Sequence, residues 1–178
     1  MHIALLRGIN VGGKNMLPMR DLAGMFERAG CAGVRTYINS GNVVFEAGEA
    51  AAAKAVRAVG EMIEARFGFR APIAVRTAGE MAAAAAACPY DAAAIYHKRL
   101  YVGFLVEQPE AARVKRLDPG RSPGDVFEVR GREVYMHLGG GAADTKLTAA
   151  YFDSVLGTVM TARNWRTVET LVGMCGGV

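Results

Sequence analysis

The chain has 178 residues, of which 52% are apolar and 21% charged, and its formal net charge is +4. This balance excludes an intrinsically disordered chain. A chain of this length also buries enough surface to fold without disulfides or a metal. Alanine inflates the apolar share, as at 82–87, and it favours helix while adding little burial energy. The mildly basic charge permits an anionic partner without requiring one.

The sequence offers no signal for a membrane or metal protein. No apolar stretch approaches the roughly 20 residues of a spanning helix, and the N-terminus lacks the basic region that opens a signal peptide. Cys31, Cys88 and Cys175 are far apart and have no metal-ligand spacing, so they are expected to be buried or partly buried thiols. We therefore predict a cytoplasmic protein with no metal, no cofactor and no membrane partner.

The first half of the chain predicts the element order β-α-β-β-α-β. Pro18 suits the first turn of a helix, and Gly30 and Gly68 suit helix ends. The polar segment 39–42 between two apolar runs is typical of a hairpin turn. The predicted strands cover 3–6, 34–38, 43–45 and 72–77, and the predicted helices cover 18–29 and 52–67.

The second half predicts the same order after a helical segment at 80–88. Gly131 and Arg132 between two alternating runs indicate a hairpin. A helix is expected to follow the glycines at 139–141 and to carry Leu147, Tyr151, Val155 and Leu156. The predicted strands cover 100–106, 126–130, 133–138 and 158–162, with a short helix at 109–117 and a last helix from Asn164 that buries Trp165, Val168, Val172 and Cys175.

These patterns predict an α+β fold of two tandem ferredoxin-like (βαββαβ) units with mainly antiparallel sheets and an added C-terminal helix. The first unit is expected to cover 1–78 and the second, with the C-terminal helix, 100–178. Residues 79–99 form a helical connector between them.

The loop after the first strand almost matches the phosphate-binding sequence GxxxxGK[ST]. In that motif the backbone amides surround the phosphates and the lysine reaches them. Here Asn15 replaces the hydroxyl residue, Pro18 would break the helix that must follow, and the predicted sheet is antiparallel. A nucleotide triphosphatase is disfavoured. An anion-binding loop that uses Arg7 and Lys14, or a purely structural loop, stays open.

Three further segments are candidate polar sites. The turn at 39–42 either forms only a hairpin or adds hydrogen-bonding groups near the first loop. Lys146 follows glycines before a predicted helix, whose N-terminus attracts anions, although Asp144 or Thr145 as a helix cap explains the segment equally well. Arg163 can grip a carboxylate or phosphate, and Asn164 suits the cap of the last helix.

Catalysis and RNA recognition have weaker support. His2, His97 and His137 lie in no triad context, and no pair of carboxylates is spaced for acid–base chemistry. RNA-recognition modules share the predicted element order but stack bases on aromatic residues of their first and third strands. Here only Phe45 occupies such a strand, and core packing explains it.

Two long segments, 4–15 and 36–45, resemble the domain of unknown function 1697 family, as do Lys146-Leu147 and the segment 161–165. This resemblance implies a bacterial cytosolic protein with a duplicated α+β fold, and it implies no activity. The segment before Lys146 departs from the family pattern, which usually contains Gly and Arg-Ser there. An anion site that used this arginine is weakened, since Asp144 brings the opposite charge.

The first functional hypothesis is a binding protein for a small anionic or phosphorylated ligand or a nucleic-acid backbone, since polar residues in loops usually carry function. The alternatives are an enzyme acting on a phosphorylated metabolite, and a structural or partner-binding protein. The candidate ligand-binding residues are Arg7, Asn10, Lys14, Asn15, Asn39, Ser40, Asn42, Lys146, Arg163 and Asn164.

Overall fold

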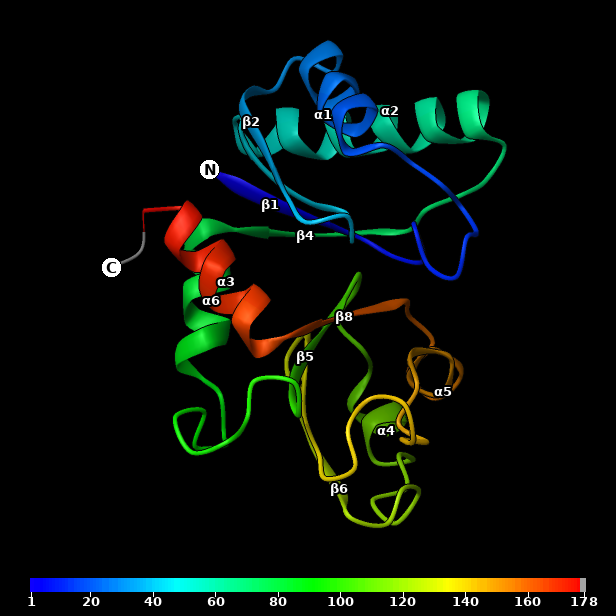
Figure 1. Ribbon diagram of the computed structural model, residues 1–178, viewed down its shortest axis with the longest axis vertical. Coiled ribbons are helices and arrows are strands. Elements are labelled where there is room, and N and C mark those ends of the chain that lie inside the picture. The colour runs from blue at the N-terminus through cyan, green and yellow to red at the C-terminus, as the bar shows by residue number, and fades with distance from the viewer. Residues whose placement is uncertain (177–178) are drawn as a thin grey trace. The chain divides into compact units, whose positions relative to one another are not determined.

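A computed structural model describes residues 1–176 of the chain (Figure 1). Within these residues it has a mixed α+β architecture with six helices and two four-stranded antiparallel sheets. In chain order the elements are β1 (His2–Leu6), α1 (Met19–Arg28), β2 (Ala32–Tyr37), β3 (Asn42–Glu46), α2 (Glu49–Phe67), β4 (Ile73–Thr77), α3 (Ala78–Ala86), β5 (Leu100–Leu105), α4 (Ala111–Val114), β6 (Asp125–Arg130), β7 (Glu133–Leu138), α5 (Ala149–Leu156), β8 (Met160–Asn164) and α6 (Trp165–Met174).

The first sheet has the strand order β2-β3-β1-β4, and α1 and α2 cover one of its faces (Figure 1). The buried positions of these elements form one core, in which Phe26 of α1 contacts Phe45 of β3 at 5.0 Å between ring centroids. The helix α2 ends where Gly68 adopts the left-handed conformation, as its sequence predicts. The element order β-α-β-β-α-β of the first half is confirmed.

The second sheet repeats this arrangement with the order β6-β7-β5-β8. Its core lies between the sheet and α5, with Phe127 of β6 edge-on to Phe152 of α5 at 5.4 Å. Gly131 opens the two-residue connection between β6 and β7 at a φ of 58°, and Arg132 follows it. The predicted hairpin is therefore confirmed, with the glycine where a positive φ is needed.

The helix expected after the glycines at 139–141 begins later than predicted. The helix α5 starts at Ala149, and Thr148 is its cap, since the Thr148 hydroxyl accepts a hydrogen bond from the Tyr151 N–H at 3.2 Å. Leu147 is buried but precedes the helix. The prediction that Lys146 lies at a helix N-terminus, with Asp144 or Thr145 as cap, is wrong.

The last helix divides between two compact parts of the chain. One comprises residues 1–81 together with the chain from Leu171, and the other comprises Ala82–Thr170. The predicted division at 1–78, 79–99 and 100–178 places the whole last helix in the second part, and residues 177–178 lie outside the described residues. The end of the helix joins the first part because the Arg35 guanidinium on β2 donates to the Met174 carbonyl at 2.5 Å.

The start of α6 agrees with its sequence, because the Asn164 side chain accepts from the Thr167 N–H at 2.9 Å and Trp165 is buried. Leu171 is buried further along the helix, whereas Val172 and Cys175 are only half-buried. None of the helices within residues 1–176 combines the length and apolar character that a membrane crossing requires.

Candidate functional site

Most of the predicted site residues gather where β1 ends and the β2–β3 hairpin turns. Two segments meet there, 7–18 and 38–41, and we call them together the loop end. The backbone joins them to the sheet, since Leu6 donates its N–H to the Gly41 carbonyl at 2.8 Å and Arg7 donates to the Pro72 carbonyl at 2.9 Å. A Cβ at Gly41 would lie 2.8 Å from the Ile9 Cδ1, so the two segments are closely packed.

The glycine-rich loop forms a small hairpin instead of a phosphate cradle. Lys14 donates its N–H to the Val11 carbonyl at 3.0 Å, and Asn10 donates to the Asn15 carbonyl at 3.1 Å. Gly12 and Gly13 make the turn, both at positive φ, as a type I′ connection requires. The amide of Lys14 is thus engaged within the hairpin, which supports the structural interpretation of this loop.

Asn10 connects the two segments of the loop end. Its side-chain oxygen accepts from the Leu17 N–H at 2.7 Å, and its amide nitrogen donates to the carbonyls of Leu17 and Asn39, both at 2.9 Å. The residue itself has a φ of 55°, which asparagine tolerates better than most residues. Asn10 therefore holds the loop together with its own side chain.

The other predicted polar residues of the loop end are also engaged locally. The Asn15 amide donates to the Gly8 carbonyl at 2.9 Å. Buried Asn42 donates to the Tyr37 carbonyl at 3.0 Å and to the Ser40 hydroxyl at 2.9 Å, which closes the hairpin turn. These residues come together in the folded chain, but their side chains shape the loops.

The surface that remains at the loop end is apolar and basic. Val11, Met16 and Ile38 expose 68%, 61% and 51% of their surface, an unusual degree for large apolar residues that share one region. Lys14 is exposed, and within residues 1–176 its ammonium makes no hydrogen bond or ion pair. Arg7 is half-buried nearby in the chain.

The loop end also holds the strained backbone of the protein. Among residues 1–176, the non-glycine residues at positive φ are Asn10, Asn15 and Ile38, and all three lie here. Ile38 is the unexpected member, because a β-branched side chain at a φ of 45° costs roughly 1–2 kcal/mol. Strain of this kind accumulates at functional sites.

A shallow open pocket of about 340 Å³ lies at the loop end, lined by Asn10, Met16, Leu17, Pro18 and Asn39. The segments 7–18 and 38–41 contain no carboxylate, imidazole or thiol. The pocket therefore offers apolar surface and amide groups for binding, but no strong general base.

Arg163 lies in the other part of the chain and is buried, with 7% of its surface exposed. Its guanidinium donates to the Thr161 hydroxyl at 2.7 Å and to the Ala162 carbonyl at 2.8 Å. Burial lowers the pKa of this guanidinium to about 10. The side chain is held within strand β8, where it is poorly placed to grip a ligand from solution.

Lys146 belongs to a loop that a buried carboxylate organises. One oxygen of Asp125 accepts from the hydroxyls of Ser122 and Thr145, both at 2.6 Å, and the other accepts from the Gly139 N–H at 2.9 Å. The Lys146 N–H donates in turn to the Ser122 hydroxyl at 3.0 Å. Sequence reasoning missed this network, although the spacing Ser-x-x-Asp just before a strand is a signal that could have indicated it.

Burial by itself raises the pKa of Asp125. The hydrogen bonds from Ser122, Thr145 and the loop amides outweigh this effect, so the pKa of the carboxyl lies below its usual value. Asp125 is therefore charged at neutral pH, and it places a negative charge next to the candidate anion site at Lys146.

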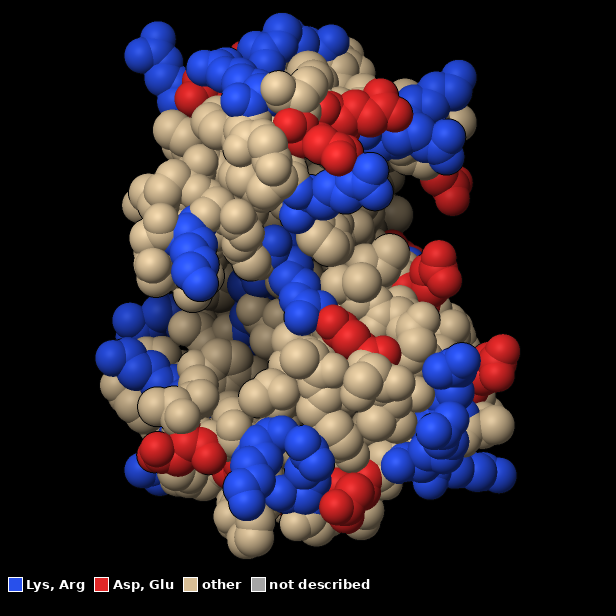
Figure 2. Space-filling model, turned by 90° about the vertical axis from the view of Figure 1, so that its right-hand side faces the viewer, with Lys and Arg blue, Asp and Glu red and all other residues tan. Residues whose placement is uncertain are grey.

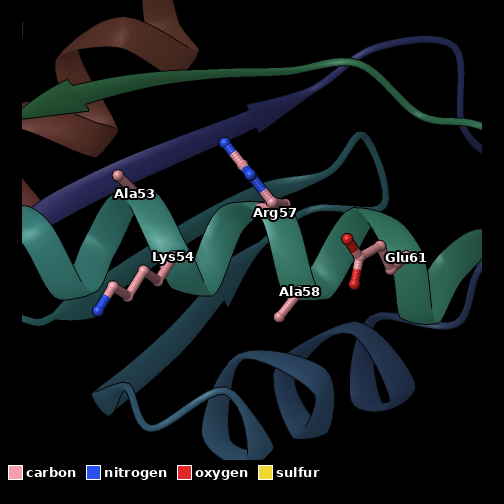
Figure 3. A pocket seen from close by; sticks show the side chains of 5 residues that line it. All are labelled: Ala53, Lys54, Arg57, Ala58 and Glu61. Carbon is pink, nitrogen blue, oxygen red and sulfur yellow. The ribbon is translucent and has the colours of Figure 1, made fainter.

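Two surfaces outside the loop end are less suited to binding. A broad depression of about 430 Å³ follows the outer side of α2, between Lys54, Arg57 and Glu61 with two alanines (Figure 3). On the face shown in Figure 2, Lys and Arg side chains are interspersed with Asp and Glu.

Burial also shifts the pKa values of titratable groups in the second part. It raises the pKa of Tyr90 to about 12 and raises the pKa of the Cys88 thiol, which is therefore protonated at neutral pH and a weak nucleophile. The rings of Tyr90 and His137 lie 6.2 Å apart between centroids and are tilted by 55°. Residues 1–176 contain no cluster of three or more His, Cys, Asp or Glu that could hold a metal ion.

Fold and site define an α+β protein with two four-stranded sheets and a strained, partly apolar loop end. Residues 1–135, most of the chain, match the family described as Protein of unknown function (DUF1697), and the chain belongs to this family. The loop end lies entirely within the matched residues, so the resemblance noted from the sequence is confirmed.

A solved structure supports the same fold. The chain is similar to the conserved bacterial protein SP0830 from Streptococcus pneumoniae, with 22% sequence identity and a TM-score of 0.69. The similarity covers 98% of this chain and 97% of that one. No curated protein matches the chain.

Proposed function

We propose that this protein is a non-catalytic binding protein whose loop end recognises an acidic polypeptide segment that carries a bulky apolar side chain. The observation that supports this most strongly is the coincidence of strain and exposure at Ile38. A β-branched residue at positive φ is unfavourable, and because the Ile38 side chain is exposed, it contributes little burial energy to offset this cost. Both the strain and the exposure of Ile38 are explained if a partner covers this surface.

The chemistry of the surface favours a polypeptide over a small anion. The side chains of Asn10, Asn15 and Asn42 bond within the loops, so few polar groups remain for a phosphate. Val11, Met16 and Ile38 instead present apolar surface that a small anion would leave uncovered. Lys14 beside them favours an acidic partner through electrostatic complementarity.

Three finer points belong to the same proposal. We infer that each half of the chain is a ferredoxin-like unit, since both have the order β-α-β-β-α-β and equivalent strand orders. The last helix, α6, is an addition that follows the second of these units in the chain. The unpaired Cys31, Cys88 and Cys175 support a cytoplasmic location.

The proposal is tested by selecting peptides from a displayed random library against the wild-type protein. We expect enriched peptides to combine Asp or Glu with Leu, Ile, Phe or Trp. Lys14→Glu should weaken the best peptide at least about tenfold in titration calorimetry, or about 1.4 kcal/mol. The matched control is Lys54→Glu, because Lys54 is also an exposed lysine and lies on α2.

Three outcomes would contradict the proposal. Peptides that bind Lys14→Glu as tightly as wild type would show that the loop end is not the recognition surface. Displacement of the peptide by millimolar inorganic phosphate would instead favour a small-anion site, and an absence of any enriched peptide would remove the support for a polypeptide partner.

Ile38→Asn is expected to separate stability from binding. Asparagine accepts the positive φ, so relief of roughly 1–2 kcal/mol of strain offsets the loss of the half-exposed side chain and the melting temperature stays unchanged or rises. Affinity for the selected peptide should fall about tenfold. Ile38→Val, which keeps strain and shape, should leave both close to wild type. A clear fall in melting temperature for Ile38→Asn would mean that the side chain serves packing instead.

A further inference from the structure

The strand β6 is an open edge of the second sheet. It lies at the end of the order β6-β7-β5-β8 and pairs with β7 in an unbroken register from Asp125↔Leu138 to Arg130↔Glu133. It contains no proline and no lysine, and within the strand the register has no bulge. Proteins commonly protect edges with those features, so β6 is available for pairing with another strand.

The hydrogen-bond pattern identifies the groups on this edge. Leu138 donates its N–H to the Arg99 carbonyl and Leu105 donates to the Arg132 carbonyl, so the even-numbered residues of 132–138 face β5. The odd-numbered residues of β7 therefore bond to β6, opposite Val126, Glu128 and Arg130.

It follows that the N–H and C=O groups of Phe127 and Val129 point away from β7. Within residues 1–176 these four groups have no hydrogen-bond partner. They form the ladder positions that an added antiparallel strand would use.

The equivalent edge of the first sheet is protected. The strand β2 has a register shift between Ala32 and Arg35, and Gly33 within it has a φ of 57°. Such a bulge twists an edge and interrupts its ladder. The contrast between two strands in the same topological position indicates that the regular edge of β6 has its own use.

We propose that β6 pairs with β6 of a second copy of this chain, antiparallel and centred on Val129, so that the second sheets of the two copies become continuous. In this register Glu128 of each copy lies opposite Arg130 of the other, which gives two cross-strand pairs of opposite charge. Glu128 and Arg130 are exposed on the same side of the strand and already contact each other at 2.6 Å.

Charge selects this register over its neighbours. Centring on Glu128 would place two Glu128 carboxylates opposite each other, which is unfavourable. Centring on Phe127 would place Glu128 opposite Val126 and leave both charges without a cross-strand partner. Arg130 has further donors, because among residues 1–176 only its Nε and one Nη are engaged, by Glu128 and by the Ala87 carbonyl.

Sedimentation equilibrium of the full chain and of charge variants tests the proposal. We expect wild type to dimerise reversibly, and Glu128→Arg or Arg130→Glu alone to raise the dimer dissociation constant at least tenfold. An equimolar mixture of these two variants should form heterodimers as tightly as wild type, because every cross-strand pair is then of opposite charge. The double variant Glu128→Arg/Arg130→Glu should also dimerise.

The mixture separates the proposed pairing from loss of the contact within one strand, since neither partner in the mixture has that contact. Glu64→Arg is the matched control, because it breaks another exposed ion pair, Arg70–Glu64 at 2.8 Å, away from β6. A wild-type chain that stays monomeric at the highest concentration, single variants that dimerise like wild type, or a mixture that does not associate would each overturn the proposal.

Discussion

Asn10→Ala is expected to lower the free energy of unfolding by about 3 kcal/mol. The substitution removes three hydrogen bonds, each contributing roughly 1 kcal/mol, although the exposed one to Asn39 contributes less. It also places alanine at a φ of 55°, which costs roughly 1 kcal/mol more. Urea unfolding followed by circular dichroism measures the change.

Asn10→Gly separates the two contributions. Glycine accepts the positive φ without cost, so the loss should fall to about 2 kcal/mol, which isolates the hydrogen bonds. Asn10→Asp keeps the acceptor for the Leu17 N–H but sets a carboxylate oxygen against the carbonyls of Leu17 and Asn39. It should therefore destabilise more than glycine. If all three variants lie within 0.5 kcal/mol of wild type, which is roughly the effect of an unremarkable surface substitution, Asn10 does not hold the loop end together.

The same substitutions connect the architecture of the loop end to its proposed role. Asn10 fixes the segment that carries Val11 and Met16 against the turn that carries Ile38. Releasing it should lower affinity for a selected peptide even in a protein that remains folded. A variant that loses stability but binds unchanged would place the recognition surface elsewhere.

The fold was largely predictable because its signals are local. Gly68 ends α2, Gly131 turns the β6–β7 hairpin, and alternation marks the strands, each through the conformation of a few neighbouring residues. The predicted start of α5 was wrong for the opposite reason, because it depends on contacts distant in the sequence. Leu147 lies in phase with the helix, but hydrogen bonds to Asp125, about 20 residues away, keep the preceding segment in a loop.

Only part of the loop end was predictable from the sequence. The polar residues 10, 39 and 42 were identified, yet only the folded chain shows that Asn10 spans 29 residues to reach Asn39 and leaves apolar side chains outside. The strain at Ile38 had no signal, because isoleucine normally favours extended backbone. Its position arises from closure of the hairpin.

The burial of Arg163 had a signal that could have been read. Arg76 occupies the same fourth position in β4 as Arg163 does in β8, paired with Ile3 and Val102 of the neighbouring strands. Both arginines are buried, and each donates to the carbonyl of the preceding residue at 2.8 Å. Arginines at the same position of two strands with equivalent neighbours indicate a structural role for both, where sequence reasoning proposed ligand binding for Arg163 alone.

Asp125→Asn is expected to destabilise the protein by about 2–3 kcal/mol at pH 7. The carboxylate accepts hydrogen bonds from two hydroxyls and from loop amides, and bonds to a charged acceptor contribute more than neutral ones. In asparagine an NH2 group replaces one carboxylate oxygen. This new donor would face either the hydroxyl donors of Ser122 and Thr145 or the Gly139 N–H. The loop at 139–147 should then loosen, and hydrogen exchange of the Gly139 and Lys146 amides should quicken.

The pH dependence of stability gives the second measurement. Because the folded pKa of Asp125 lies below its unfolded value, the unfolded state binds the proton first as the pH falls. The stabilisation is fully present above the unfolded pKa of about 4 and is lost as the pH falls through the folded pKa. Urea midpoints of wild type should therefore decline below pH 4 more steeply than those of Asp125→Asn, so the two proteins converge.

Asp144→Asn, which changes an exposed aspartate in the same loop, serves as the control and should follow wild type. Parallel curves for wild type and Asp125→Asn would mean that the carboxylate does not carry the charge-dependent stability of this loop.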